Sequence, residues 1–377
     1  MKKFSIVFSY VIFMLAGGIF GVALIEFFGF HELNMSDKVL FICISLVYLY
    51  IALMFNIIVH EAGHLVAGLM SGYKFASFRV GSFMLKKEEE KLVLKRFTLA
   101  GTGGQCLMAP PDLVDGKIPF VFYNIGGALA NLITFVVSII LMFVTKDVKL
   151  LSLLFFITAL IGLMLALSNG VPMRSGEVDN DGMNIISLSK DPLAMKALWV
   201  QLKINECTSK NISLRDMDDE WFELPENADM KNVLISSIAA FKCNKLMAER
   251  KFEETKKAID ALLNSNAVIV GIYQTLLKLD KAYIEMISNN NKVLVDALIE
   301  KQDKNIIMAM KNFPSVIRYQ YTYALLIDKD TKKAAEYRKH MEFVKKNYPY
   351  MVDVEDELEL MNLADEVLSD RENNDNV

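Results

Sequence analysis

The chain is poor in cysteine and in net charge. Its 377 residues include four cysteines, Cys43, Cys106, Cys207 and Cys243, and none forms the close pair that is typical of a thiolate metal site. The formal net charge is −4, which is too small to indicate a nucleic-acid partner. The sequence therefore predicts no disulfide framework and no binding of nucleic acid.

Charged residues are missing from long stretches of the first half. Hydrophobic residues make up 53% of the chain, which is high for a single water-soluble domain. Runs of about 18 or more uncharged, mostly apolar residues can cross a bilayer as helices. Four runs qualify, at roughly 4–25, 39–59, 118–145 and 150–171. No small-residue cleavage site follows the first run, so we expect it to be retained.

The distribution of lysine and arginine predicts how these spans are oriented. The connection between the second and third spans contains eight basic residues, whereas the other two connections contain three in total. The positive-inside rule places the basic connection and both termini in the cytoplasm. We therefore expect a multi-pass protein of the cytoplasmic (inner) membrane, surrounded by lipid bilayer, whose thiols outside the spans stay reduced.

Hydropathy divides the chain near Asp191, after which no long uncharged run remains. The expected fold class is an α-helical polytopic membrane protein with about four transmembrane helices and a small β-hairpin insertion, followed by an all-α soluble domain. The expected segments are 1–38 (first span and external loop), 39–188 (core, with hairpin and loop at 74–117), 189–366 (cytoplasmic helical domain) and 367–377 (polar, disordered tail).

The connection at 74–117 does not resemble a span. "KFASFRVGSFML" and "EEKLVLKRFTLA" are rich in aromatic and branched residues and flank the polar turn "KKEEE", which predicts a β-hairpin. "GTGGQCLMAPP" predicts a glycine-rich loop that stops at its two prolines.

The soluble half predicts helices in pairs. Apolar residues recur at spacings of three and four in 229–265 and 316–349, with breaks near 250–252 and 328–330. The pairs resemble degenerate tetratricopeptide repeats, which form concave binding surfaces, although an irregular helical domain fits equally well. We expect this domain to bind a protein partner, the substrate's cytoplasmic tail or a second copy of the chain.

The stretch "FNIIVHEAGHLVAGLMSGY" places costly side chains within an apolar helix. His60 and His64 lie one helical turn apart, so both imidazoles can bind one metal ion, and Glu61 can reach a metal-bound water. This H-E-x-x-H pattern is typical of zinc peptidases. Burying these groups without a metal or partner costs several kcal/mol. The alternative is a pair of interfacial histidines that hydrogen-bond to lipid or to the hairpin.

A catalytic zinc site needs a third protein ligand. The other two histidines, His31 and His340, fall on the far side of the membrane and deep in the soluble half, so a carboxylate is expected. The candidates follow the fourth span in "LALSNGVPMRSGEVDNDGMNI" and are Glu177, Asp179 and Asp181.

Three motifs together resemble the site-2 protease family of intramembrane zinc metalloproteases. That family carries H-E-x-x-H on one core span, G-x-x-x-N on the next, and N-x-x-P followed by D-G on a third. This chain has "HEAGH" at 60–64, "GALAN" at 127–131, "NGVP" at 169–172 and "DG" at 181–182. The resemblance covers about residues 40–185. It implies that Zn²⁺ is held by His60, His64 and Asp181, with Glu61 as the catalytic glutamate.

The chain departs from that pattern in two places. More residues than usual separate Pro172 from Asp181, so Asp179 stays the alternative third ligand. Ala128 stands where a proline often follows the glycine, although Gly126 and Gly127 still permit close helix packing.

The remaining motif residues have two interpretations each. Each asparagine either binds substrate or has a structural role. The structural role of Asn131 would be to hold helices together, and that of Asn169 would be to end a helix. Gly127 and Pro172 are assigned to the same substrate-binding or structural group.

The resemblance implies an intramembrane zinc endopeptidase that cuts a membrane-embedded protein or a small peptide precursor, with Glu61 as general base toward a zinc-activated water. The alternative is a non-catalytic membrane receptor or immunity protein that retains the zinc site. A proton-coupled transporter is a third class, but the paired repeats typical of transporters are not visible.

Overall fold

The computed structural model of the protein describes residues 2–88, 91–98, 102–175 and 178–375. The chain divides into two compact units. The first comprises Met1–Val80 and Gly103–Pro192, and the second comprises Gly81–Thr102 and Leu193–Val377.

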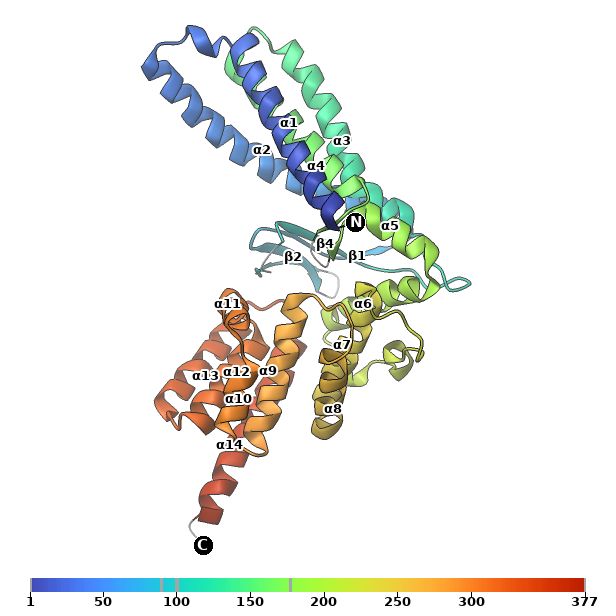
Figure 1. The fold of residues 1–377 in the computed structure, drawn as a ribbon, viewed down its shortest axis with the longest axis vertical. Coiled ribbons are helices and arrows are strands. Elements are labelled where there is room, and N and C mark those ends of the chain that lie inside the picture. Colours follow the sequence, from blue (N-terminus) through green and yellow to red (C-terminus); the bar gives the residue numbers. More distant parts are fainter. Residues whose placement is uncertain (1, 89–90, 99–101, 176–177, 376–377) are drawn as a thin grey trace. The chain divides into compact units, whose positions relative to one another are not determined.

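Four long helices build most of the first unit (Figure 1). Three of them are long and apolar enough to cross a membrane. In the first helix the apolar part is Tyr10–Glu26, within the residues whose side chains the structure describes. The membrane character is therefore confirmed, and a membrane-spanning role for the first helix stays a prediction. The helices are α1 (Lys2–Glu26), α2 (Met35–Met70), α3 (Phe120–Val144) and α4 (Lys149–Gly170).

Helix α2 is much longer than the span predicted at 39–59. Its 36 residues rise about 54 Å, whereas a bilayer's hydrocarbon core is about 30 Å thick. Asn34 is the N-cap of this helix, and its side chain accepts a hydrogen bond from the Asp37 amide. The helix ends at Met70, two residues before Gly72, which has φ +84°. The apolar run and the H-E-x-x-H motif thus belong to one uninterrupted helix.

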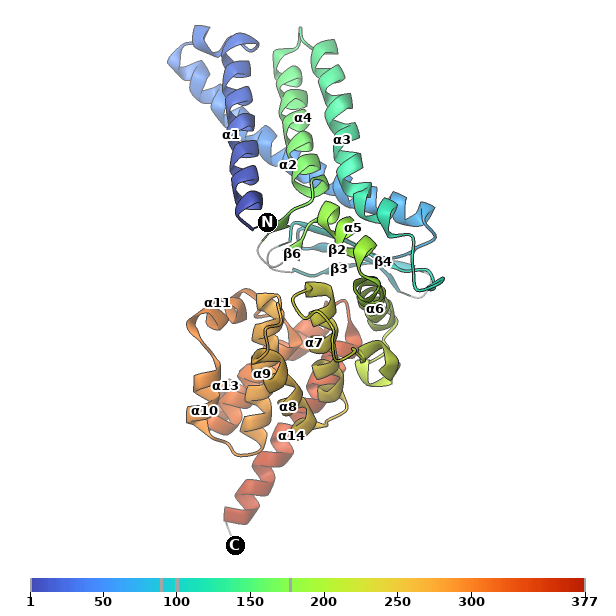
Figure 2. The same cartoon turned by 45° about the vertical axis from the view of Figure 1, so that its right-hand side comes forward.

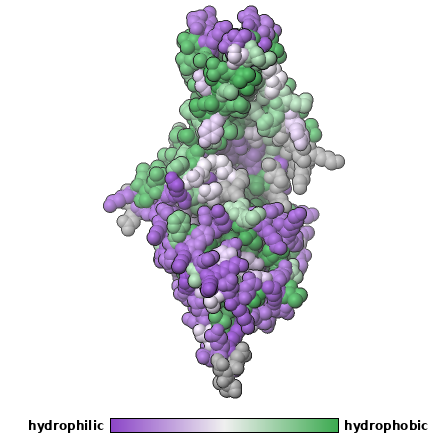
Figure 3. All heavy atoms as spheres, turned by 90° about the vertical axis from the view of Figure 1, so that its left-hand side faces the viewer, coloured by the Kyte–Doolittle hydropathy of each residue, from purple (hydrophilic) through white to green (hydrophobic). Residues whose placement is uncertain are grey.

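The outward surface of this unit is apolar, as expected for helices that face lipid. The buried cluster of α1, α2, α3 and α4 includes Phe28, Ala52, Leu153 and Phe156. Large hydrophobic side chains are nevertheless exposed along the same helices. Figure 3 shows hydrophobic side chains over most of the α1–α4 surface on one face, and hydrophilic ones over most of the second unit.

Strand pairing corrects one prediction. Strand β1 (Lys74–Val80) pairs antiparallel with β4 (Gly104–Ala109), from Lys74 opposite Ala109 to Val80 opposite Gly104. The segment "GTGGQCLMAPP" was expected to be a loop, but its apolar part forms β4. The glycines suggested a loop, whereas β1 supplies the hydrogen-bonding edge that makes a strand favourable, and the prolines then end it.

The expected β-hairpin is confirmed in the second unit. Strand β2 (Phe83–Glu88) pairs antiparallel with β3 (Lys91–Arg96), and β2 includes the first three residues of the expected polar turn, 86–88. The rest of that turn, 89–90, lies outside the described residues. The segment before the turn is not one strand, because Gly81 adopts φ +57° and separates β1 from β2. The hairpin groups with the helical domain rather than with the membrane core, to which the sequence assigned it.

Helices make up the rest of the second unit (Figure 2). The breaks expected near 250–252 and 328–330 lie between α7 and α8 and before α13. The elements are α6 (Pro192–Ser209), η2 (Leu214–Asp216), η3 (Asp219–Phe222), α7 (Val233–Ala248), α8 (Phe252–Leu263), α9 (Gly271–Ile287), α10 (Lys292–Leu298), α11 (Lys301–Ala309), α12 (Pro314–Thr322), a π-helical turn (Tyr323–Ile327), α13 (Thr331–Lys345) and α14 (Met351–Asp375).

The tail expected to be disordered from 367 onward is helical as far as it is described, because α14 continues to Asp375. Val367 and Leu368 pack against the main core of the unit. The Arg371 guanidinium donates hydrogen bonds to the carbonyls of Met286, Ile287 and Ser288 at the end of α9. These packing contacts and hydrogen bonds stabilise the end of α14 as a helix.

Candidate metal centre

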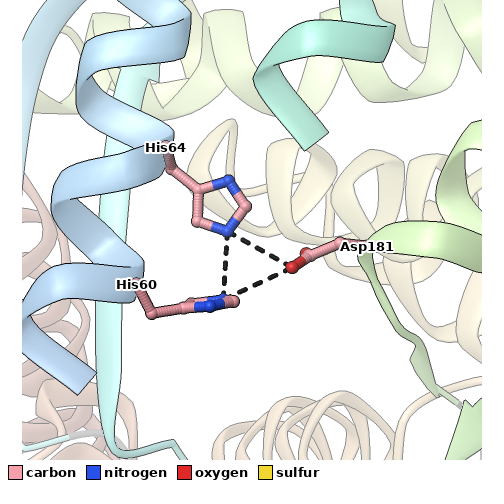
Figure 4. Close-up of side chains that lie close together, drawn as sticks. All are labelled: His60, His64 and Asp181. Carbon is pink, nitrogen blue, oxygen red and sulfur yellow. Dashed lines mark hydrogen bonds and ion pairs between the residues drawn. The ribbon is translucent and has the colours of Figure 1, made fainter. Parts of the chain in front are cut away.

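Three side chains converge beside α2 (Figure 4). His60 and His64 come from α2, and Asp181 is the first residue of α5 (Asp181–Lys190). The two Nε2 atoms lie 3.2 Å apart, and each lies 3.3 Å from Asp181 Oδ2. A tetrahedral zinc ion with ligand distances of about 2.0–2.1 Å separates its ligands by about 3.3–3.4 Å. The triangle therefore has the size that zinc requires.

The chemistry of the three atoms also fits a cation. The His64 Nδ1 atom lies 2.8 Å from the Tyr123 carbonyl oxygen, which can only accept, so Nδ1 carries a proton and the neutral imidazole presents an electron pair at Nε2. Asp181 Oδ2 is buried without a hydrogen-bond partner. Electron pairs that face one another at this distance repel unless a cation lies between them.

Asn180 holds Asp181 in place. It is the N-cap of α5, where its Oδ1 accepts from the amides of Met173 and Met183 at 2.9 Å each. Its Nδ2 donates to the carbonyls of Ser168 at 2.7 Å and Val171 at 2.6 Å. One side chain therefore ties the start of α5 to the end of α4.

Gly182 lets α5 approach α4 closely. A Cβ atom here would lie 2.3 Å from the Gly170 carbonyl oxygen and 3.1 Å from the Pro172 nitrogen. The "DG" pair thus combines a candidate ligand with a residue that no larger one could replace. Pro172 follows the C-cap of α4, Val171, as predicted for a helix end.

The rival carboxylate has another partner. Asp179 in β6 (Val178–Asp179) accepts from the Arg174 guanidinium of β5 (Arg174–Ser175) at 2.6 and 3.2 Å, and from the Ser187 hydroxyl at 3.1 Å. It is absent from the group that converges on His60 and His64 among the described residues. Glu177 lies outside the described residues.

Glu61 lies against β4. A Cβ atom at Gly104 would lie 2.6 Å from Glu61 Oε1, so the Glu61 carboxylate packs directly against the β4 backbone. The strand therefore orients the carboxylate next to the histidines. Burial and the charge of Glu61 raise the pKa of Cys106 to about 12, so the Cys106 thiol stays neutral and is a poor metal ligand.

Small residues bring α3 close enough to complete the centre. A Cβ atom on Gly127 would lie 2.5 Å from His64 Nε2 and 2.7 Å from His60 Nε2. Gly63 and Gly126 face each other across α2 and α3, where a Cβ on either would lie 2.3 or 2.5 Å from the other's carbonyl oxygen. This confirms the close packing expected of Gly126 and Gly127.

The two asparagines of the motifs have different surroundings. Asn131 is fully buried, and its Oδ1 lies 2.8 Å from His60 Nδ1. Asn169 donates to the Leu165 carbonyl of its own helix at 3.0 Å and approaches the Ser168 hydroxyl at 3.4 Å. The structure thus connects Asn131 to the centre and places the Asn169 contacts at the end of α4.

Sequence reasoning missed two residues that organise this site. The role of Asn180 could have been predicted from the sequence, because asparagine directly before a helix is a favoured N-cap. The role of Asn56 could not, because Thr158 and Asn131, to which it hydrogen-bonds, lie far from it along the chain.

Burial raises the pKa of the Asp181 carboxyl, but the neighbouring His60 and His64 imidazoles outweigh this effect and lower the pKa to about 2. Asp181 is therefore ionised at neutral pH and supplies a negative charge to the centre.

Membrane-type helices that carry two imidazoles, a carboxylate and a neighbouring glutamate define the class of membrane metallopeptidases. The family model that matches is Peptidase family M50, over residues 48–324. The chain belongs to this family, whose peptidases use zinc and act on membrane-embedded proteins or peptides. No curated protein and no solved structure matches the chain significantly.

Proposed function

We propose that the chain is an intramembrane zinc endopeptidase that hydrolyses a membrane-embedded protein or a small peptide precursor. The observation that carries this proposal is the triangle of His60, His64 and Asp181, whose atoms lie 3.2–3.3 Å apart with Glu61 alongside. Bound zinc would supply Lewis acidity, which makes water nucleophilic at neutral pH and polarises the scissile carbonyl.

The chain's own residues then have distinct tasks. Asp181 and the two imidazoles hold the ion. Glu61 takes the proton from the attacking water and passes it to the leaving amine as the peptide bond breaks. Glu61 can do this because the close approach of Gly104 in β4 limits where its carboxylate can lie.

A transmembrane substrate must unwind before it is cut, because helical hydrogen bonds shield its amides. We propose that the unwound segment adds to the β-strands at 74–109, as extended peptides add to sheet edges. The contact between Gly104 of β4 and Glu61 supports this route, since a chain extended along β4 passes the catalytic carboxylate.

The proposed orientation follows from the lysines and arginines, with both termini and the strands at 74–109 in the cytoplasm. The helical domain would then meet the cytoplasmic part of a substrate or a partner protein.

The deciding experiment compares wild type with Glu61→Gln in the native host, with mass spectrometry of labelled new N-termini in membrane and secreted fractions. Glutamine keeps the shape but cannot accept the proton. Glu336→Gln on the exposed face of α13 is the matched control. A fragment that disappears only in Glu61→Gln, while its precursor accumulates, supports the protease. Equal profiles at equal expression support the non-catalytic receptor instead.

A further inference from the structure

One face of α3 contacts both ring nitrogens of His60. A Cβ atom on Gly127 would lie 2.7 Å from His60 Nε2, the nitrogen that faces His64 and Asp181. Asn131 stands one turn further along α3, and its Oδ1 lies 2.8 Å from His60 Nδ1 on the other side of the ring. The position and the protonation of this imidazole therefore depend on what Asn131 presents to it.

The backbone of α2 determines which end of the Asn131 amide faces His60. The other end lies 3.0 Å from the Asn56 carbonyl oxygen, which can only accept a hydrogen bond, so that end is the NH₂ group. The same NH₂ group lies 3.2 Å from Asn56 Oδ1, which can accept its second hydrogen. The Asn131 oxygen is thereby left facing His60, and the backbone carbonyl alone is sufficient to fix this orientation.

The consequence is the tautomer of His60. A neutral imidazole has one donor nitrogen and one acceptor nitrogen. Because the Asn131 oxygen only accepts, the proton lies on His60 Nδ1, and Nε2 keeps the electron pair that a metal needs. His64 reaches the same state through the Tyr123 carbonyl. A side chain thus sets the tautomer of one ligand, and the backbone sets that of the other.

The surroundings of Asn131 argue against a direct contact with substrate. The residue is fully buried, and both hydrogens of its NH₂ group have acceptors on α2. A role in holding α2 and α3 together accounts for the bonds to Asn56, but it does not explain why the oxygen faces a candidate metal ligand. A partner for His60 accounts for both ends of the amide.

We propose that Asn131 is a positioning residue of the metal centre: it accepts the Nδ1 proton of His60 and so fixes the tautomer and ring orientation in which Nε2 can bind zinc. This inference rests on the metal binding in the proposed function. Histidines that bind a metal through one nitrogen are commonly held by an acceptor at the other nitrogen. Without that acceptor, His60 is free to carry its proton on Nε2, which excludes a metal.

Two substitutions of Asn131 separate this role from helix packing. Asn131→Leu has nearly the same size but offers His60 no acceptor. Asn131→Asp keeps an oxygen that accepts from His60 while it loses the NH₂ group. Asn124→Leu is the matched control, because Asn124 is buried two turns earlier on α3 and donates only within its own helix, to the Phe120 carbonyl at 2.8 Å.

The first readout is the histidine tautomer in the metal-free, full-length protein at alkaline pH, from ¹⁵N NMR of histidine-labelled samples. His31 and His340 are replaced by glutamine, so that only His60 and His64 give signals. We expect the Nδ1–H form at both in wild type, in Asn131→Asp and in Asn124→Leu. In Asn131→Leu an Nε2–H population should appear at His60 alone, because the acceptor of His64 belongs to the backbone.

The second readout is zinc affinity, measured by competition with a chromophoric chelator. We expect Asn131→Leu to weaken zinc binding by roughly 10- to 100-fold, as is usual when the partner of a metal-binding histidine is lost. Asn131→Asp should bind zinc more tightly than Asn131→Leu, because a carboxylate is also a common acceptor for such a histidine. Asn124→Leu should bind zinc like wild type.

Several outcomes would overturn the proposal. A wild-type His60 with its proton on Nε2 would do so without any variant, so the proposal can be tested even if a variant fails to fold. Tautomers and zinc affinity in Asn131→Leu that match those of Asn124→Leu would also overturn it, and a cleavage defect alone would then assign Asn131 to substrate binding. Asn131→Asp that binds zinc no better than Asn131→Leu would reduce the role to packing. A wild type that binds no zinc would instead contradict the proposed function.

Discussion

The Lys86 ammonium lies 5.3 Å from the centre of the Tyr350 ring and donates a 2.5 Å hydrogen bond to the Pro349 carbonyl. Lys86 is almost fully buried, so the β2–β3 hairpin is anchored to the helical domain. Phe97, just after β3, adds ring contacts with Phe313 and Tyr348. The hairpin is therefore part of the second unit's hydrophobic core.

Lys86→Met is expected to destabilise the second unit by about 2 kcal/mol, because it leaves the Pro349 carbonyl without its charged donor. The melting temperature should fall by roughly 4–8 °C. Tryptophan fluorescence measures this selectively, since the chain's two tryptophans, Trp199 and Trp221, both lie in this unit. Lys91→Met on the exposed face of the same hairpin is the control. Equal melting of the two variants would contradict the anchor.

Stability of the second unit is expected to depend on pH through two carboxyl groups. Burial raises the pKa of Glu357 to about 8, although Arg318 opposes the shift. Burial and the Asp356 charge raise the pKa of Asp353 to about 7, against the effect of Lys86. The folded state thus keeps protons that the unfolded state releases above about pH 4. Stability from these groups is full below that pH and is lost as pH rises through 7 and 8.

The fluorescence melting temperature should therefore be higher at pH 6 than at pH 9. Glu357→Gln is neutral at every pH and should flatten this slope, raising stability at pH 9 by on the order of 2 kcal/mol. Glu336→Gln should keep the wild-type slope. The same slope in both variants would show that Glu357 does not carry the effect.

The sequence predicted the parts of the site that depend on local spacing. His60, Glu61 and His64 lie within one turn of helix, so a single periodic pattern identifies them. The choice between Asp179 and Asp181 depends on where α5 begins, which Asn180 decides through carbonyls of the preceding helix. Whether Asp181 binds the metal is still a prediction that needs a direct test.

Long-range contacts explain what the sequence did not predict. Strand β4 resembled a loop in the sequence because the strand that pairs with it, β1, is separated from it along the chain by the β2–β3 hairpin. Asn56 looked like one more polar residue in an apolar helix, because its role depends on Asn131 and Thr158 of other helices. Residues after 366 looked disordered because the carbonyls that Arg371 caps belong to α9.

Gly127→Ala is expected to abolish zinc binding without unfolding the protein. The added methyl group would lie 2.5 Å from His64 Nε2 and 2.6 Å from His60 Cε1, so both imidazoles must move away from Asp181. Zinc content after purification should fall at least tenfold, while circular dichroism stays helical. Gly21→Ala in α1 is the control, because nothing lies within 4 Å of a Cβ there. Full zinc occupancy in Gly127→Ala would contradict the close approach of α3.

Asp181→Asn and Asp179→Asn decide between the two candidate ligands. Asp181 Oδ2 lies 3.3 Å from both histidine Nε2 atoms, and an amide there removes the negative charge that favours a divalent cation. We expect Asp181→Asn to weaken zinc binding by at least 100-fold in a chelator competition. Asp179→Asn should bind zinc within about threefold of wild type, because its carboxylate pairs with Arg174. If Asp179→Asn loses zinc while Asp181→Asn retains it, the third ligand is Asp179, and α5 must begin differently when the metal is bound.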